Sequence, residues 1–310
     1  MTIARAVEFP YIKMKPKSLI LVLVGGLWLT QTTMAEARGD KFPPFLYAAE
    51  GAQKIIRYGS DGKVDWEYPA EMARDVWTLP NHNVLFCFNR RYDSGKHDNP
   101  SGVMEVTLDK RVVFAFSTTG QVWSCQRLPD GNTLVGAASL GKLLVVSPEA
   151  KVIKTIQLLN PPGHSCLRNA RQIVNGHFLV AEESARAARE YSAEGNLVRE
   201  IKLSFAPFSV VRLENGNTVI SGQQSTVEVD RADKIIWSVE GKDLPGLGIR
   251  WFAGIQVLPN STIFVCNAGG KVPFFEISRD KRITWQSPSD MIIPLGHGIQ
   301  RLDLDGEPRR

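Results

Sequence analysis

The sequence predicts an all-β protein, a six-bladed β-propeller with four antiparallel strands in each blade. Two turn motifs recur six times each along the chain, and the two chain ends carry complementary parts of one blade. Repeats of about 40 to 50 residues that hold several short strands are typical of propeller blades. No long segment has apolar residues at helical spacing, which argues against a helical fold.

The first motif is a tight turn between two short apolar runs. RLPDGNTLVG (127–136) and RLENGNTVIS (212–221) are two similar copies, and an Asp-Gly or Asn-Gly pair in this setting indicates a β-hairpin. Aligned on the residue before the turn, the six copies lie 40 to 49 residues apart. They begin at Leu79 (LPNHN), Leu128 (LPDGN), Ile173 (IVNGH), Leu213 (LENGN), Leu258 (LPNST) and Leu302 (LDLDG).

The second motif is a turn, then a cation or Asn, then a strand rich in Val, Ile or Leu. Its copies are DGKVDW (61–66), DKRVVF (109–114), EAKVIK (149–154), EGNLVR (194–199), ADKIIW (232–237) and DKRITW (280–285). Each repeat therefore reads as strand a, turn, strand b, loop, strand c, turn, strand d. Tryptophan recurs at one strand-d position, where we expect it to pack between blades.

The chain ends complete one blade between them. HGIQRLDLDG (297–306) supplies a strand a with nothing after it, and residues 45–69 supply strands b, c and d with no strand a before them. Joining them removes the open sheet edges that would invite aggregation. The expected blades are 75–120, 121–166, 167–207, 208–251, 252–291, and 292–310 with 45–69.

The N-terminal residues read as an export signal. Residues 13–37 combine a basic start, a short apolar stretch and the small-residue pattern Ala35-Glu36-Ala37. We expect a signal peptide over 1–37, a linker over 38–44, one propeller over 45–310, and secretion or periplasmic location; membrane contact would come only through an uncleaved signal segment. The formal charge of +5 falls to +3 without residues 1–37, which argues against nucleic-acid binding.

The pattern R-L-x-N-G-N-T, followed by D-x-x-G/D-K-I-x-W, resembles the PQQ-like β-propeller repeats of exported bacterial proteins. It is also similar to six-bladed arylsulfotransferase-like enzymes, in which a channel histidine accepts sulfate; His297, in GHG, would be its counterpart. The vicinal cysteines and eight-blade length of quinoprotein dehydrogenases are lacking, so we expect no cofactor. The four cysteines have no zinc-ligand spacing, and no metal site is expected.

One face of the predicted propeller carries the long loops. The a–b and c–d turns are short and uniform, whereas the b–c and d–a connections include 89–102, 158–169, 240–251 and 287–298. Variable loops on a rigid scaffold are where recognition residues usually lie. We therefore place the binding face on the b–c and d–a side.

Counting back from the first motif places residues at the mouth of the central channel. Five positions before it stand Arg74, Trp123, Arg168, Phe208, Ala253 and His297; four before stand Asp75, Ser124, Asn169, Ser209, Gly254 and Gly298. Alternation along a strand directs the second set at the channel. Loop residues His164, Arg250 and Trp251 would join this funnel. Arginines beside aromatic rings suit an anionic ligand.

Three functions remain open on this evidence. The favoured one is a binding module for a small anionic ligand, a glycan or a protein partner, through Arg74, Trp123, Arg168, Asn169, Arg250, Trp251 and His164. The alternative is a transferase, lyase or hydrolase that acts on a sulfated or acidic substrate, with His297 as nucleophile or general base beside Arg74 and Arg168. The third is a scaffold subunit of an envelope complex.

Overall fold

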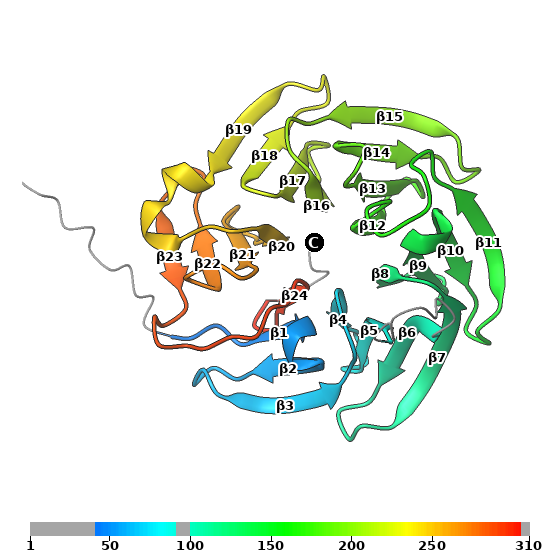
Figure 1. Ribbon diagram of the computed structural model, residues 1–310, viewed down its shortest axis with the longest axis horizontal. Helices are drawn as coiled ribbons and strands as arrows, with labels where there is room; N and C mark the ends of the chain where they lie inside the picture. Colours follow the sequence, from blue (N-terminus) through cyan, green and yellow to red (C-terminus); the bar gives the residue numbers. More distant parts are fainter. Residues whose placement is uncertain (1–40, 91–99, 305–310) are drawn as a thin grey trace, which may run out of the picture. The chain divides into compact units, whose positions relative to one another are not determined.

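The computed structural model describes residues 41–90 and 100–304 of the chain. The predicted signal peptide, the start of the linker and residues 91–99 of the first long loop lie outside the described residues. The described chain forms six sheets of four antiparallel strands, arranged as blades in a ring (Figure 1). The predicted six-bladed propeller is therefore confirmed.

In blades 1 to 5 the strands follow one another from the centre outwards in chain order, and in blade 6 the C-terminal strand lies innermost. Blade 1 holds β4 (Val76–Thr78), β5 (Val84–Asn89), β6 (Pro100–Val106) and β7 (Val112–Thr119). Blade 2 holds β8 (Val122–Arg127), β9 (Thr133–Ala137), β10 (Lys142–Val146) and β11 (Val152–Gln157). Blade 3 holds β12 (Asn169–Gln172), β13 (Phe178–Glu182), β14 (Ala187–Tyr191) and β15 (Leu197–Lys202).

The remaining blades repeat this order. Blade 4 holds β16 (Pro207–Arg212), β17 (Thr218–Gly222), β18 (Ser225–Val229) and β19 (Ile235–Glu240). Blade 5 holds β20 (Phe252–Val257), β21 (Ile263–Asn267), β22 (Phe274–Ile277) and β23 (Ile283–Gln286), and blade 6 holds β24 (Ile299–Arg301), β1 (Phe45–Ala49), β2 (Lys54–Tyr58) and β3 (Val64–Pro69). One boundary differs from the prediction: Pro207 begins blade 4, because it pairs with Gly222 across a bulge.

The ring closes through blade 6, as the two chain ends predicted. The C-terminal strand β24 pairs with β1, with Tyr47 opposite Ile299 and Phe45 opposite Arg301. Because the two strands come from opposite ends of the chain, their hydrogen bonds join the N-terminal and C-terminal parts of blade 6 and so close the ring. No described helix is long and apolar enough to cross a membrane.

The repeated a–b turns need one residue in the left-handed region of backbone space. That position is glycine in the two clearest copies, Gly131 (φ 85°) and Gly216 (φ 86°), and glycine adopts it without steric cost. His82 (φ 64°) and Ser261 (φ 65°) occupy the same position in blades 1 and 5. The turn geometry thus persists in blades whose sequence match is weak.

The hydrophobic core is divided among the spaces between neighbouring blades. Six clusters of buried apolar side chains lie there among the described residues, each drawn from two adjacent blades. Two of the strand-d tryptophans reach the next blade: Trp66 donates to the Leu108 carbonyl and Trp237 to the Arg279 carbonyl. This packing fixes the innermost strands, which position the site.

Candidate functional site

A cavity of about 200 Å³ lies at the centre of the ring. Its walls come from the innermost strands of blades 2 to 6, from the loops that lead into the innermost strands of blades 1, 3, 5 and 6, and from Glu183 in the loop after β13. Seven of the eight residues proposed from the sequence line it: Arg74, Trp123, His164, Arg168, Asn169, Trp251 and His297. Counting positions back from the turn motif therefore found most of this wall.

Arg250 is the exception among the predicted residues. Its guanidinium lies 4.4 Å from the centroid of the Trp251 ring, and it does not line the cavity. The backbone amide of Arg250 donates to the Asn267 side chain, and its guanidinium lies against the turn at Gly269. The loop thus directs Trp251 toward the cavity and Arg250 toward its own blade, so the structure does not bring Arg250 together with the other predicted residues.

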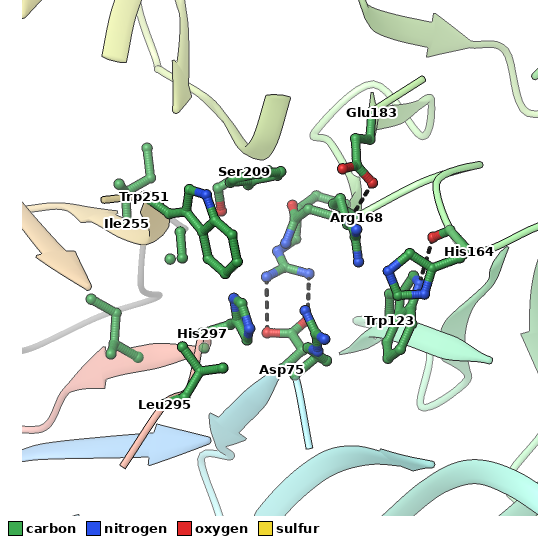
Figure 2. A pocket seen from close by; sticks show the side chains of 18 residues that line it. Asp75, Trp123, His164, Arg168, Glu183, Ser209, Trp251, Ile255, Leu295 and His297 are labelled. Carbon is green, nitrogen blue, oxygen red and sulfur yellow. Dashed lines mark hydrogen bonds and ion pairs between the residues drawn. The ribbon is translucent and has the colours of Figure 1, made fainter. Parts of the chain in front are cut away.

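The cavity has one apolar side and one polar side. Trp251, Ile255 and Leu295 lie on the first, and Arg168, His164 and Trp123 lie on the second (Figure 2). Phe208 packs edge-on against Trp251, with ring centroids 6.1 Å apart. Rings at the edge of a polar wall suit a ligand that is itself part apolar and part polar.

Glu50 joins two of the predicted residues to each other. Its carboxylate accepts a hydrogen bond from Nη2 of Arg74 at 2.9 Å, and its other oxygen lies 2.8 Å from Nε of Arg74 in an ion pair and 2.9 Å from Nε2 of His297. All three side chains are about 15% exposed or less. A carboxylate can only accept a hydrogen bond, so Nε2 of His297 must carry the hydrogen that it donates. Glu50 therefore favours the tautomer of His297 with hydrogen on Nε2 and a lone pair on Nδ1.

Both histidines at the cavity favour the neutral form. Burial and the nearby Arg74 cation lower the pKa of His297 to about 4, although Glu50 opposes the shift. Burial, Arg168 and Arg74 lower the pKa of His164 as well. Neutral imidazole can accept a hydrogen bond or a proton, whereas imidazolium cannot.

A second ion pair stands on the polar wall. Nε of Arg168 donates to Glu183 at 2.5 Å, and the Arg168 guanidinium lies 5.7 Å from the Trp123 ring centroid and 5.9 Å from that of Phe208. Nη1 of Arg168 is buried and has no hydrogen-bond partner among the described residues. Arg168 therefore keeps donor capacity that Glu183 does not use.

A third pair lies deeper in the cavity. Arg171 holds Asp75 through two bonds, Nη1 to Oδ2 at 2.7 Å and Nη2 to Oδ1 at 3.1 Å (Figure 2). Both side chains are at least nine-tenths buried. Three arginines thus meet three carboxylates, and the cavity is close to neutral, unlike the open cluster of arginines that the sequence predicted.

Sequence reasoning missed Glu50, Glu183 and Arg171, and each had a signal. Glu50 and Glu183 stand at the same place, the first residue after strand b, in blades 6 and 3. Arg171 stands two positions after Asn169, so strand alternation directs both to the same side. Counting positions two before the turn motif, as well as four and five before it, would have included Arg171.

The sequence matches no family model and no curated protein sequence. Its fold is similar to that of a protein of unknown function from Bacteroides caccae, with a TM-score of 0.70 and 24% identity over 83% of this chain and 98% of that one. It is similar also to a catalytically inactive histidine-to-alanine variant of virginiamycin B lyase from Staphylococcus aureus with quinupristin, with a TM-score of 0.59 and 11% identity over 83% of this chain and 90% of that one.

A streptogramin B lyase has the same level of likeness, with a TM-score of 0.59 and 13% identity over 83% of each chain. Identities this low show a shared fold and nothing further. The resemblance to PQQ-like repeats stays a prediction, since no family model supports it. The comparisons place the chain among six-bladed propellers.

Proposed function

We propose that this protein is an exported binding module that takes the ring-bearing end of a small organic anion into its central cavity. The proposal is supported first by the Arg168 guanidinium, which retains an unpaired donor beside two aromatic rings. The guanidinium forks of Arg74 and Arg171 each hold a carboxylate at two points. One acceptor group at Arg168, such as a carboxylate or a sulfate, would satisfy the unpaired Nη1 donor of that side chain.

The size of the cavity supports a small ligand over a glycan chain or a protein loop. An apolar cavity of about 150 Å³ is enough to hold benzene, and this cavity measures about 200 Å³. It therefore has room for one ring with a polar substituent. A larger ligand would keep its remainder among the long loops of the same face.

Near-neutrality of the cavity limits the charge of the ligand. Glu50, Asp75 and Glu183 offset the three arginines, and both histidines favour the neutral form. A ligand with one negative charge would share the Arg168 guanidinium with Glu183, through the Nη1 donor that Glu183 does not use. A doubly charged ligand would leave one charge buried without a partner, which is costly.

Calorimetric titration with benzoate and phenyl sulfate, and with neutral benzyl alcohol, tests the proposal. Arg168→Gln should weaken binding of both anions at least ~10-fold, since a hydrogen bond to a charged group contributes about 1.5–3 kcal/mol, and should affect benzyl alcohol less. Arg212→Gln is the matched control, because Arg212 forms a similarly buried pair with Glu190 at the far end of an innermost strand. Equal effects of both substitutions on anion binding would contradict the proposal.

A second candidate function, catalysis on a sulfated or acidic substrate, is favoured by the bond between His297 and Glu50. A base held by a carboxylate through its other nitrogen is a recurring catalytic arrangement. In virginiamycin B lyase, which shares the fold at low identity, a histidine-to-alanine variant is catalytically inactive. In this chain Nδ1 of His297 would be the reacting nitrogen, and Glu50 would position it.

Release of 4-nitrophenolate from 4-nitrophenyl sulfate tests this second function. If His297 acts on the sulfate, His297→Ala should abolish release, and Glu50→Gln should lower kcat more than it raises KM. Release at the same rate in His297→Ala would exclude the role. Export is tested separately, by mass spectrometry of the secreted chain, which should begin within a few residues of Ala37.

A further inference from the structure

Asp75 and Arg171 depart from the pattern that the blades otherwise follow. Two positions before the turn motif, where blade 3 has Arg171, three other blades have glutamine: Gln126, Gln256 and Gln300. Each of these glutamines accepts a bond from a backbone amide of the next blade, at 2.7 to 2.8 Å. Where blade 1 has Asp75, four positions before the motif, the other blades have serine, asparagine or glycine.

The pair joins three consecutive blades. Oδ2 of Asp75 in blade 1 accepts from the backbone amide of Cys125 in blade 2 at 3.1 Å, and from Arg171 in blade 3. Arg171 also donates to the Ala170 carbonyl and lies 4.8 Å from the Trp77 ring centroid. The guanidinium is therefore fixed in one place.

The place is the inner end of the cavity. Each innermost strand starts at the loop face and runs away from it, so residues later in the strand lie deeper. Among the residues of innermost strands that line the cavity, Arg171 is the furthest along its strand relative to the turn motif. Figure 2 shows Asp75 and the guanidinium bound to it between the apolar and polar sides.

A buried ion pair is a weak source of stability, since desolvation offsets much of the attraction. Other blades carry uncharged residues at the positions of Asp75 and Arg171, so the presence of an ion pair at the inner end of the cavity needs another explanation. We propose that Asp75 and Arg171 form a specificity-determining floor, which stops a ligand at the depth of one ring and admits only an uncharged group at that end. This inference rests on the proposed binding function.

The charges of Asp75 and Arg171 explain why only an uncharged group is admitted at the inner end. A negative group at the inner end would meet Asp75, and a positive group would meet Arg171, while each is already bound to the other. Either group would have to break the pair or remain buried without a partner. The anionic group of the ligand must then lie outward, at the level of Arg168, and the uncharged end must enter first.

Three probes separate depth from charge: benzoate, the longer biphenyl-4-carboxylate, and terephthalate, which carries a second carboxylate opposite the first. The wild-type protein should bind benzoate at least ~10-fold more tightly than the other two. Asp75→Asn retains an oxygen that can accept from Cys125 but removes the charge that neutralises Arg171. It should improve terephthalate binding at least ~10-fold, because Arg171 can then bind the second carboxylate.

The double variant Asp75→Ser/Arg171→Gln installs residues that other blades carry at these positions. It should raise the affinity for biphenyl-4-carboxylate, relative to the affinity for benzoate, at least ~10-fold over the wild-type ratio. Glu105→Gln is the control, because it breaks an ion pair with Arg127, which is less buried and lies at the other end of the innermost strand β8. It should leave the ranking of the probes unchanged.

If the three probes keep the same order of affinity in Asp75→Asn and in the double variant, the proposal that Asp75 and Arg171 form a floor is refuted. If the wild-type protein binds no aryl carboxylate, the proposed function fails, and the crystal structure of the double variant then decides the inference. A cavity that extends further along the axis in that structure supports the floor. A cavity of unaltered depth refutes it.

Discussion

The neutral state of His297 makes a quantitative prediction about stability in acid. Burial and Arg74 lower its pKa from 6.5 to about 4 in the folded protein. Between these two values the unfolded chain binds a proton that the folded protein does not. Stability therefore falls as pH falls through this window, and below about pH 4 the loss is complete.

The size of the loss follows from the shift. A difference of about 2.5 pH units, at about 1.36 kcal/mol per unit, corresponds to about 3 kcal/mol. The side chain is 15% exposed, so solvent screening reduces this value little. His297→Gln removes the titrating group, and the variant should lack this part of the pH dependence.

Urea unfolding of the wild-type protein and His297→Gln at intervals from pH 7 to pH 4 measures the difference. The free energy of unfolding should fall by about 3 kcal/mol more in the wild-type protein. Parallel curves for the two proteins would refute the reasoning. So would an imidazole resonance of His297 that titrates with a midpoint near 6.5.

Three further outcomes are expected. Glu50→Gln should cost about 3 kcal/mol in urea unfolding, because it leaves the buried Arg74 cation without its partner; a loss below about 1 kcal/mol would contradict the pairing. Gly254→Ala should lower the free energy of unfolding by about 2 kcal/mol, since the added Cβ would lie 2.1 Å from the His297 carbonyl oxygen. Gly246→Ala is the control: its Cβ would have no atom within 4 Å, and the free energy of unfolding should change by less than about 0.5 kcal/mol. Burial raises the pKa of Cys166 and Cys266 to about 12, so neither thiol should react with Ellman's reagent at pH 8 before denaturant is added; immediate reaction would show that they are accessible.

The fold could be predicted because its determinants are local and repeated. A turn such as the one at Gly131 is specified by a few neighbouring residues, and six copies of the motif fix the number of blades. Counting back from the turn motif then carries the prediction to the cavity wall, where it placed Trp123 and Arg168. Both steps depend only on positions along the chain.

The ion pairs could not be predicted in the same way. Glu50 and His297 come from opposite ends of the chain, and Asp75 and Arg171 from blades that are not neighbours. Which arginine keeps a free donor depends on which carboxylate each side chain reaches. Loop residues such as Arg250 follow no alternation, so the direction of that side chain had no signal in the sequence.

A crystal structure of the protein soaked with benzoate is the most direct test of the proposed site. We predict that the ring lies in the central cavity between Trp123 and Trp251, with its carboxylate at Arg168 and its uncharged edge toward Asp75 and Arg171. Benzoate bound outside this cavity, or bound in it with the carboxylate at the inner end, would contradict the assignment.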